Sequence, residues 1–264
     1  MLGSAESLIR LSMFLGCLLF FLILEITIPY RPNSVSKTKR WANNMLITLF
    51  NSVIINLLFS ALIVKTAIYV NTHQLGILNL IDLPRWPKIC ITVVFMDLML
   101  YVWHLLNHEM PLFWRFHRVH HSDLNMDVST ATRFHIGELA ISAVIRISLI
   151  FFLGASTFGV FIFESLLVLC AQFHHSSLKV PGWFEKFFWI LFVPPSMHRI
   201  HHSVVIKERD TNYGTIFSLW DRSFGTFLSN VDQDRIRIGM GAYPKPNKLN
   251  FHQLLAMPFT RPVR

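Results

Sequence analysis

Long apolar runs separated by short polar segments dominate the chain. The first run covers residues 11–29, the second covers 46–70 and the third covers 89–106. A transmembrane helix needs about 20 predominantly apolar residues, so these runs have the length of membrane-spanning helices. No stretch shows the strict alternation of apolar and polar residues that marks a strand. The pattern therefore predicts an all-α membrane protein.

A fourth apolar segment, 136–173, is broken by Gly154 and Ser156 into two short helices. At 1.5 Å per residue these helices either cross the bilayer twice or form a re-entrant hairpin, and the sequence leaves both open. The apolar stretch 183–195 is too short to span, so we expect it to lie in the membrane interface. The first run has no small-residue cleavage site and carries Glu25, which favours a retained helix over a signal peptide.

Basic residues set the expected orientation. The loop 31–40 carries four basic residues, whereas Arg10 alone precedes the first run. Under the positive-inside rule this loop is cytoplasmic. Counting crossings from it places the end of the third run, at His104, and the end of the 136–173 segment, at His174, on the cytoplasmic side. We therefore expect an integral membrane helical bundle of about four spans, with a cytosolic helical cap that holds the histidines.

Composition supports the membrane class. Apolar residues make up 53% of the chain and charged residues only 15%. The formal net charge of +9 would also suit a nucleic-acid-binding protein. However, the basic residues flank apolar runs and do not form a stripe, and contact with anionic lipid headgroups explains such positions equally well. We expect no nucleic-acid partner. The three cysteines lie in apolar runs without a CxxC pattern, which argues against a disulfide framework, an iron–sulfur site or a covalent haem.

The histidines carry the chemical information. All of them except His73 and His252 fall into five groups, which read HLLNH from 104, HRVHH from 117, RFH ending at 135, HH at 174–175 and HRIHH from 198. Helix positions i and i+4 project from one face, so the HxxxH and HxxHH groups can direct two or three imidazole nitrogens to one point. Polar groups beside a membrane are costly unless they are used. The clustering therefore predicts a metal site.

The number of histidines favours a dinuclear centre. A structural zinc site needs four ligands, and these groups offer about nine. Imidazole suits zinc, copper, iron and nickel, so the residues by themselves leave the metal open. Soluble di-iron bundles use glutamates and a Glu-x-x-His pattern, which the sequence lacks. An all-nitrogen centre beside membrane helices suggests oxygen activation on a lipid.

The ordered motifs resemble one known family. HLLNH, WRFHRVHHS, DVSTATRFHIGE, HHS, SMHRIHHS, DTNYG and LWDRSFGTF follow one another, over roughly residues 30–230, as in the fatty acid hydroxylase/sterol desaturase superfamily. Asp97 and Tyr101, ahead of the first histidine pair, match as well. The resemblance implies an O₂-dependent membrane oxidoreductase that hydroxylates, desaturates or oxidatively cleaves a fatty acyl, sterol or ether lipid. It also implies two iron ions and, because no nicotinamide or flavin motif is present, a separate electron-donor protein.

The same resemblance assigns the metal ligands. The nine expected ligands are His104, His108, His117, His120, His121, His175, His198, His201 and His202. His174 is the alternative to His175, and Ile136 replaces a proline that often follows the RxH histidine in the family, which leaves the role of His135 open. No catalytic residue beyond the ligands is assigned.

Charged residues near the motifs are expected to orient the imidazoles. The candidates are Asp127, Arg133, Glu138, Asp210 and Asp221. Trp220 and Phe224 are expected to pack rather than to take part in chemistry.

We expect one membrane domain over residues 1–264. Within it, 1–88 forms the N-terminal spans and a loop, 89–230 the catalytic region and 231–264 a polar tail. The lipid is expected to slide from the bilayer into an apolar slot lined by 89–106 and 136–173, with Leu139 and Ala143 facing the slot.

Two other classes compete with a lipid oxygenase. A histidine-rich membrane metal transporter or sensor would hold its ligands near the bilayer midplane on discontinuous helices, whereas these histidines sit at helix ends. A zinc-dependent lipid hydrolase would need fewer ligands and an open water position. The sequence leaves open which lipid and which carbon react, and which protein supplies electrons.

Overall fold

The fold is helical throughout the residues that the computed structural model describes, 2–58 and 60–261. The seven long helices are α1 (Leu2–Thr27), α2 (Lys37–Leu58), α3 (Ser60–Thr72), α4 (Arg85–Glu109), α5 (Pro111–His121), α6 (Ile136–Leu153) and α7 (Thr157–His175). The short α-helices are α8 (Gly182–Phe188), α9 (Pro195–His201), α10 (Ile206–Arg209), α11 (Leu219–Phe224) and α12 (Phe251–Ala256). The 3₁₀ turns are η1 (Ile77–Asn79), η2 (Val128–Thr132), η3 (Gln233–Arg235), η4 (Pro246–Lys248) and η5 (Met257–Phe259). Within these residues β-pairing is limited to three isolated bridges, so the predicted all-α class is confirmed.

Four helices are long and apolar enough to cross a membrane. They are Leu8–Thr27 of α1, Arg85–Glu109, Ile136–Leu153 and Thr157–His175. The predicted number of spans agrees with this set. The 136–173 segment forms two such helices, α6 and α7, which favours two crossings over a re-entrant hairpin.

The second apolar run, 46–70, is predicted from the sequence to form one spanning helix. Its residues form the end of α2, up to Leu58, and α3, from Ser60, and residue 59 between them lies outside the described residues. Helix α2 carries polar side chains on one face. Asn44 and Asn51 are buried, and together with Thr48 they form a stripe at i, i+4 and i+7 that bonds to the 123–134 segment.

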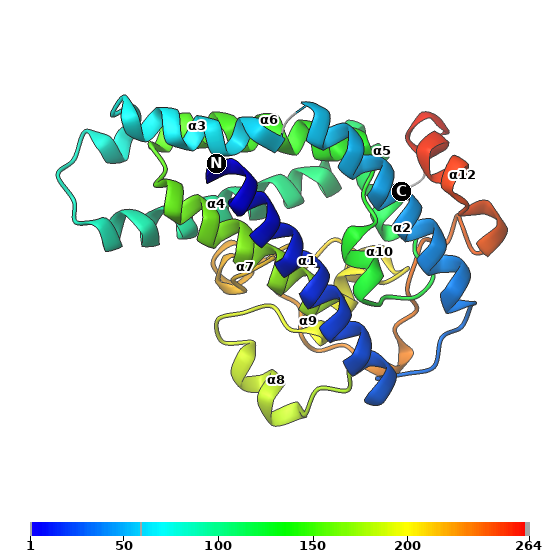
Figure 1. Cartoon of the computed structure of the whole chain (residues 1–264). Coiled ribbons are helices and arrows are strands. Elements are labelled where there is room, and N and C mark those ends of the chain that lie inside the picture. The colour runs from blue at the N-terminus through cyan, green and yellow to red at the C-terminus, as the bar shows by residue number, and fades with distance from the viewer. Residues whose placement is uncertain (1, 59, 262–264) are drawn as a thin grey trace.

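The bundle has two distinct ends (Figure 1). At one end, the loop after α3 meets the loop between α6 and α7, where Asn71 Nδ2 donates to the Ala155 carbonyl at 2.7 Å. At the other end, α4 and α7 run into the histidine motifs, and α5 and α9 pack beside them. The two candidate spans that end on histidines, α4 and α7, thus have these ends on the same side of the bundle.

The core is centred on α4. Its buried Val93 and Met96 join Ile150 of α6 and Phe163 of α7 in one apolar cluster. Helix α7 approaches α4 closely because Gly159 faces Thr92, where an added Cβ would lie 2.8 Å from the Thr92 Cβ.

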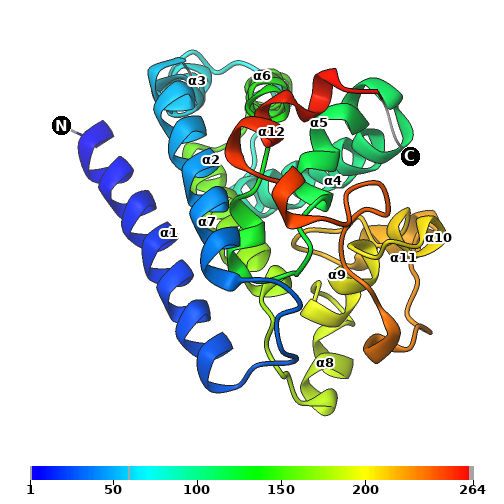
Figure 2. The ribbon, with the colours of Figure 1, turned by 90° about the vertical axis from the view of Figure 1, so that its right-hand side faces the viewer.

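The segment after residue 231 packs onto the histidine end. Helix α12 lies beside α2, and η5 lies against α5 (Figure 2). Leu254 and Met257 are buried with Val119 of α5. The fully buried Arg118 donates to the main-chain carbonyls of Met257, Thr260 and Arg261, which fixes this segment over the outer face of α5.

Gly76 is required where the two loops meet away from the histidines. Its φ is +83°, and a Cβ there would lie 2.2 Å from the Gly154 nitrogen. Gly76→Ala should therefore lower the free energy of unfolding by about 2 kcal/mol or more, because the new methyl group meets rigid backbone. Thermal unfolding of the purified protein in detergent measures the change. Gly16→Ala is the matched control, since a Cβ at Gly16 meets nothing within 4 Å. Equal melting temperatures for the two variants would contradict this packing.

Candidate metal centre

The local sequence explains how the histidines reach one place. Helix α4 continues past its apolar part and presents His104 and His108 from one face of its last turns. Pro111 then occupies the first turn of α5, where its missing N–H costs nothing, and the chain reverses into the HRVHH motif. Pro195 begins α9 in the same way, ahead of His198. Prolines thus separate the helices that carry the motifs.

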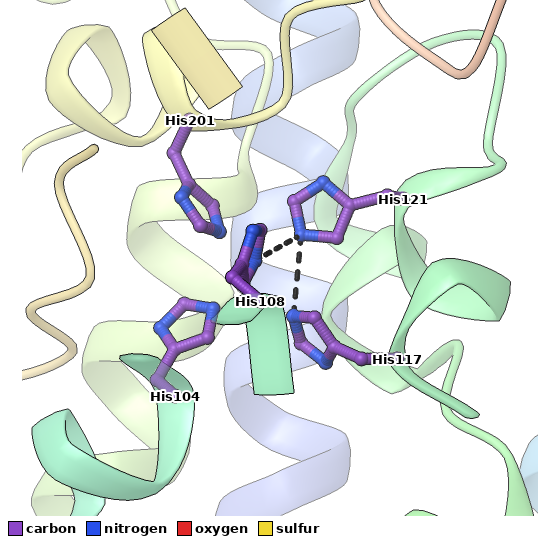
Figure 3. Close-up of side chains that lie close together, drawn as sticks. All are labelled: His104, His108, His117, His121 and His201. Carbon is purple, nitrogen blue, oxygen red and sulfur yellow. Dashed lines mark hydrogen bonds between the residues drawn. The ribbon is translucent and has the colours of Figure 1, made fainter. Parts of the chain in front are cut away.

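Five histidines form a first group. They are His104, His108, His117, His121 and His201. Each offers one ring nitrogen, and these nitrogens all lie within 4.8 Å of one another. The His121 Nε2 lies 3.1 Å from the His108 Nε2 and 3.2 Å from the His117 Nε2. Figure 3 shows the five rings directed toward a common point from α4, α5 and α9.

Four histidines form a second group beside the first. They are His120, His175, His198 and His202. The His175 Nε2 lies 3.0 Å from the His120 Nε2 and 2.9 Å from the His198 Nε2. His121 of the first group stacks on His202 with ring centroids 4.4 Å apart, so the two groups share a wall.

Burial favours the neutral form of three rings outside the candidate spans. Removal from water, together with the neighbouring imidazoles, holds the pKa of His120, His121 and His202 well below the usual histidine value. A neutral imidazole has a lone pair on one nitrogen and is the form that binds metal. The surroundings of these three rings therefore favour ligation over protonation.

The hydrogen bonds decide which nitrogen carries the lone pair in five of the rings. The Nδ1 atoms of His104, His201 and His175 face the carbonyls of Tyr213, Thr211 and Ala171 at 2.7 Å, 2.8 Å and 2.7 Å. Carbonyls only accept, so each Nδ1 carries the proton and each Nε2 is a bare acceptor.

Two carboxylates fix the Nδ1 proton of two further rings, those of His117 and His108, as the carbonyls do for the first three. Glu138 accepts from the His117 Nδ1 at 2.8 Å, and Asp210 accepts from the His108 Nδ1 at 3.1 Å. Both were expected from the sequence to orient imidazoles. The carbonyl acceptors were not, because every residue has a carbonyl and no residue type marks its position.

The donor set fits metal cations. Four of the five fixed rings, all except that of His175, turn their Nε2 atoms toward one another in the first group. The buried Nε2 atoms of His104 and His201 have no hydrogen-bond partner among the described residues. Facing lone pairs repel unless a positive charge lies between them. Two groups with five and four imidazole nitrogens provide enough ligands for two ions that prefer nitrogen. The ligand role of the nine histidines stays a prediction, but the structure brings all nine together.

Other charged residues expected near the site act through the backbone. Asp221 accepts from the amides of Tyr213 and Gly214 and so holds the Tyr213 carbonyl against His104. Arg133 donates to the Val119 carbonyl inside the HRVHH motif at 2.9 Å. Neither Asp221 nor Arg133 forms a hydrogen bond with a histidine side chain among the described residues.

Asp127, expected from the sequence to orient an imidazole, instead belongs to a buried ion-pair cluster beside α5. Arg40 of α2 contacts Asp123 at 2.6 Å and Asp127 at 2.8 Å, and all three are buried. Burial on its own would raise the pKa of Asp123, but Arg40 and Arg133 outweigh it and hold this pKa well below the usual value. Arg40 lies in the basic stretch 31–40 from which the membrane orientation is predicted. Its charge also pairs with two buried carboxylates inside the protein, which the composition of that stretch does not reveal.

Helix α4 also positions the loop that carries the carbonyls. Asp97 accepts from the amides of Ile216 and Phe217 and from the Trp220 Nε1 at 2.8 Å. The Tyr101 hydroxyl lies 2.9 Å from the Thr226 hydroxyl. Trp220, expected only to pack, therefore also anchors this loop.

Four histidines lie outside the two groups. His135 caps α6, where its Nδ1 accepts from the Gly137 amide at 3.0 Å. His174 is buried and packs against His198 with ring centroids 4.0 Å apart and the rings tilted by 41°, while His175 takes the place in the second group. His73 and His252 are exposed, as their isolation in the sequence suggests.

A cavity of about 380 Å³ ends on the histidines. His104, His117, His120, His174, His175 and His198 line its inner end. Leu100 and Trp103 of α4, Leu139 of α6 and Leu167 of α7 line its walls, as the sequence predicts for a slot between these helices. Ala143 is fully buried but does not line the cavity, and Ser142 lies there in its place. Helix α2, not foreseen as a wall, contributes Asn51 and Ile55 among others.

Comparison with known protein families matches residues 89–226 to the family described as fatty acid hydroxylase. This range covers more than half of the chain, and the chain belongs to that family. The resemblance in the motifs is thereby confirmed. No solved structure gave a significant match.

Curated relatives of this chain act on several kinds of lipid. It is 29% identical over 185 residues to ornithine lipid hydroxylase OlsE of Rhizobium tropici, covering 68% of this chain and 54% of that protein. It is 29% identical over 164 residues to human alkylglycerol monooxygenase, covering 60% and 35%. With rat cholesterol 25-hydroxylase the identity is 24% over 155 residues, covering 57% and 50%. The chain thus spans about a third to a half of the length of these relatives.

Glu138 offers a test of how the imidazoles are oriented. Glu138→Gln should weaken metal retention by roughly 10–100-fold. The neutral amide oxygen accepts a weaker hydrogen bond from the His117 Nδ1–H than the carboxylate does, so it holds the ring less firmly. Elemental analysis after dialysis against graded chelator measures retention. Glu109→Gln, at an exposed position on the end of α4, is the control. Unchanged retention in Glu138→Gln would show that this carboxylate does not orient a ligand.

Proposed function

We propose that this protein is a membrane di-iron oxygenase that hydroxylates or desaturates a C–H bond of a lipid, using O₂ and electrons from a separate protein. The observation that supports it most directly is the cavity between membrane-spanning helices that ends on two adjacent groups of buried histidines. Family membership supplies the class of reaction, and the relatives' names are those of lipid hydroxylases and monooxygenases.

The nine histidines would hold two iron ions, and these ions would supply the reduction of O₂ and the oxidation of the C–H bond. The chain's own residues have the task of positioning. Glu138, Asp210 and three backbone carbonyls fix which nitrogen each ring presents. The apolar cavity walls exclude water and bring one carbon of a lipid chain to the histidine end.

The geometry favours an oxygenase over the competing classes. A metal transporter or sensor needs a path for the ion, whereas the ligands here are buried at helix ends and open onto an apolar cavity. A zinc hydrolase needs three protein ligands and a water position, whereas these groups contain five and four histidines.

We place the metal centre on the cytoplasmic side, where an electron donor can reach it. Exposed basic residues at the histidine-bearing end support this orientation. They are Lys39, Lys179, Lys207, Arg235, Lys245 and Lys248. The aromatic-rich α8, with Trp183 and Phe187 exposed, suits the adjoining interface.

Lipid analysis tests the reaction directly. Mass spectrometry of lipids from cells with and without the gene, grown under ¹⁸O₂, should reveal a species that gains one labelled oxygen or loses two hydrogens. A lipid profile that is the same in both cells, with the protein present and loaded with iron, would be fatal to the proposal.

Individual ligands give the second test. His120→Ala and His201→Ala remove one ligand from each group, so turnover should fall by more than the roughly 10–100-fold typical of losing an orienting partner. Metal content, measured by elemental analysis, should fall in both. His73→Ala and His252→Ala should leave both quantities unchanged, because these rings are exposed and belong to neither group. Similar losses in all four variants would mean that the grouping has no catalytic meaning.

The cavity wall gives the third test. Leu139→Trp fills the cavity near its histidine end and should shift preference toward shorter chains, because each misplaced methylene costs roughly 1–3 kcal/mol. Competition between lipids of different chain length measures the shift. Val144→Trp is the matched control, since Val144 lies on the exposed side of the same helix. If both variants keep the original preference, the substrate chain does not occupy this cavity.

A further inference from the structure

Three charged side chains meet inside the membrane-spanning part of the bundle, away from the histidines. They are Arg10 of α1, Arg146 of α6 and Glu164 of α7, and each lies within a candidate span. Charged groups in such positions are costly and are rare without a use. Two guanidinium groups share one carboxylate here, so the set carries a net charge of +1.

Arg146 is the less satisfied of the two cations. Arg10 Nη1 forms a close ion pair with Glu164 Oε2, whereas Arg146 Nη1 lies 3.6 Å from Glu164 Oε1, beyond hydrogen-bonding distance. The Nε atoms of both arginines are buried and have no hydrogen-bond partner among the described residues, so the longer contact to Glu164 is what distinguishes Arg146. Most donors of this guanidinium are therefore free to bind a ligand.

Arg146 also lines the cavity that ends on the histidines. Glu138, Ser142 and Arg146 follow one another at intervals of four residues along α6, and all three line this cavity. Glu138 bonds to His117, so the strip runs from the first group to Arg146. Eight residues of helix separate Glu138 from Arg146, which corresponds to roughly 12 Å.

We infer that Arg146 binds an acidic group, a carboxylate or a phosphate, on the lipid that occupies the cavity. A planar guanidinium matches these anions with two parallel hydrogen bonds, and the surplus charge of the three side chains is neutralised when the anion binds. Glu164 limits the strength of the site by drawing part of the charge away. The substrate class is then an acidic amphiphile whose chain extends from Arg146 toward the histidines. The acidic group lies roughly 12 Å from the carbon at the histidine end. This rests on the proposed function only in taking the histidine end as the reacting end.

Equilibrium binding of tritiated palmitic acid to the purified full-length protein in neutral detergent tests the inference. Competition by unlabelled palmitic acid, hexadecyl phosphate and methyl palmitate measures how much the acidic group contributes to binding affinity. The acid and the phosphate should compete at least about tenfold better than the ester, because only they accept charge-assisted hydrogen bonds. Equal competition by the ester would overturn the inference.

Variants separate binding from folding. Arg146→Gln should lose the preference for the acid, Arg146→Lys should keep part of it, and Glu164→Gln should strengthen acid binding several-fold. Strengthening is not expected if the three side chains only hold helices together. Arg235→Gln, at an exposed arginine that does not line the cavity, is the matched control. An unchanged preference in Arg146→Gln, or weaker acid binding in Glu164→Gln, would refute the role of Arg146.

A bulk membrane lipid is the alternative source of the acidic group. If phosphatidylglycerol displaced palmitic acid as well as hexadecyl phosphate does, Arg146 would hold a bilayer headgroup and the substrate assignment would be wrong. These measurements need no turnover. A protein that binds the acid through Arg146 but never consumes O₂ with any lipid would support this inference and would defeat the proposed function.

Discussion

The constraint on which the structure depends is the removal of a large set of imidazoles from water. A buried imidazole must place its proton on an acceptor and its lone pair on something positive, since neither is then solvated. The protein meets the first need with Glu138, Asp210 and the carbonyls of the loop around Tyr213. Metal ions bound between the rings would meet the second. Both needs dictate where the surrounding elements lie.

Much of the remaining architecture can be explained as support for those acceptors. Asp97 on the spanning helix α4 holds the 211–226 loop from below, and Asp221 holds the same loop from within. Arg40 joins α2 to Asp123 and Asp127 on the far side of α5. Buried ion pairs contribute little net stability, and removal of one partner is strongly destabilising. Their value here is to fix the orientation of helix α5.

The sequence predicted what local spacing controls. The i and i+4 intervals place His104 beside His108 and His117 beside His121 in any helix, and apolar run length identifies the spanning helices. It did not predict which atoms complete the site, because the Thr211, Tyr213 and Ala171 carbonyls depend on tertiary contacts. Nor did it predict that a buried polar stripe on α2, which overlaps the apolar run 46–70, bonds to a segment about 80 residues away. The length of an apolar run carries no information about a hydrogen-bonding segment so distant in the sequence.

The order of the ligands along the chain has a consequence for how the protein matures. Each group combines residues from α5 with residues in or directly after α9: the first group contains His201, and the second contains His202, which follows the end of α9. The candidate spanning helices α1, α4, α6 and α7 all precede these positions and can enter the membrane while synthesis continues. A metal ion held by either group would therefore gain its full set of ligands only after the chain through residue 201 or 202 has left the ribosome. Metal loading would then be a late event, and each bound ion would close a long loop and link helices that are already inserted.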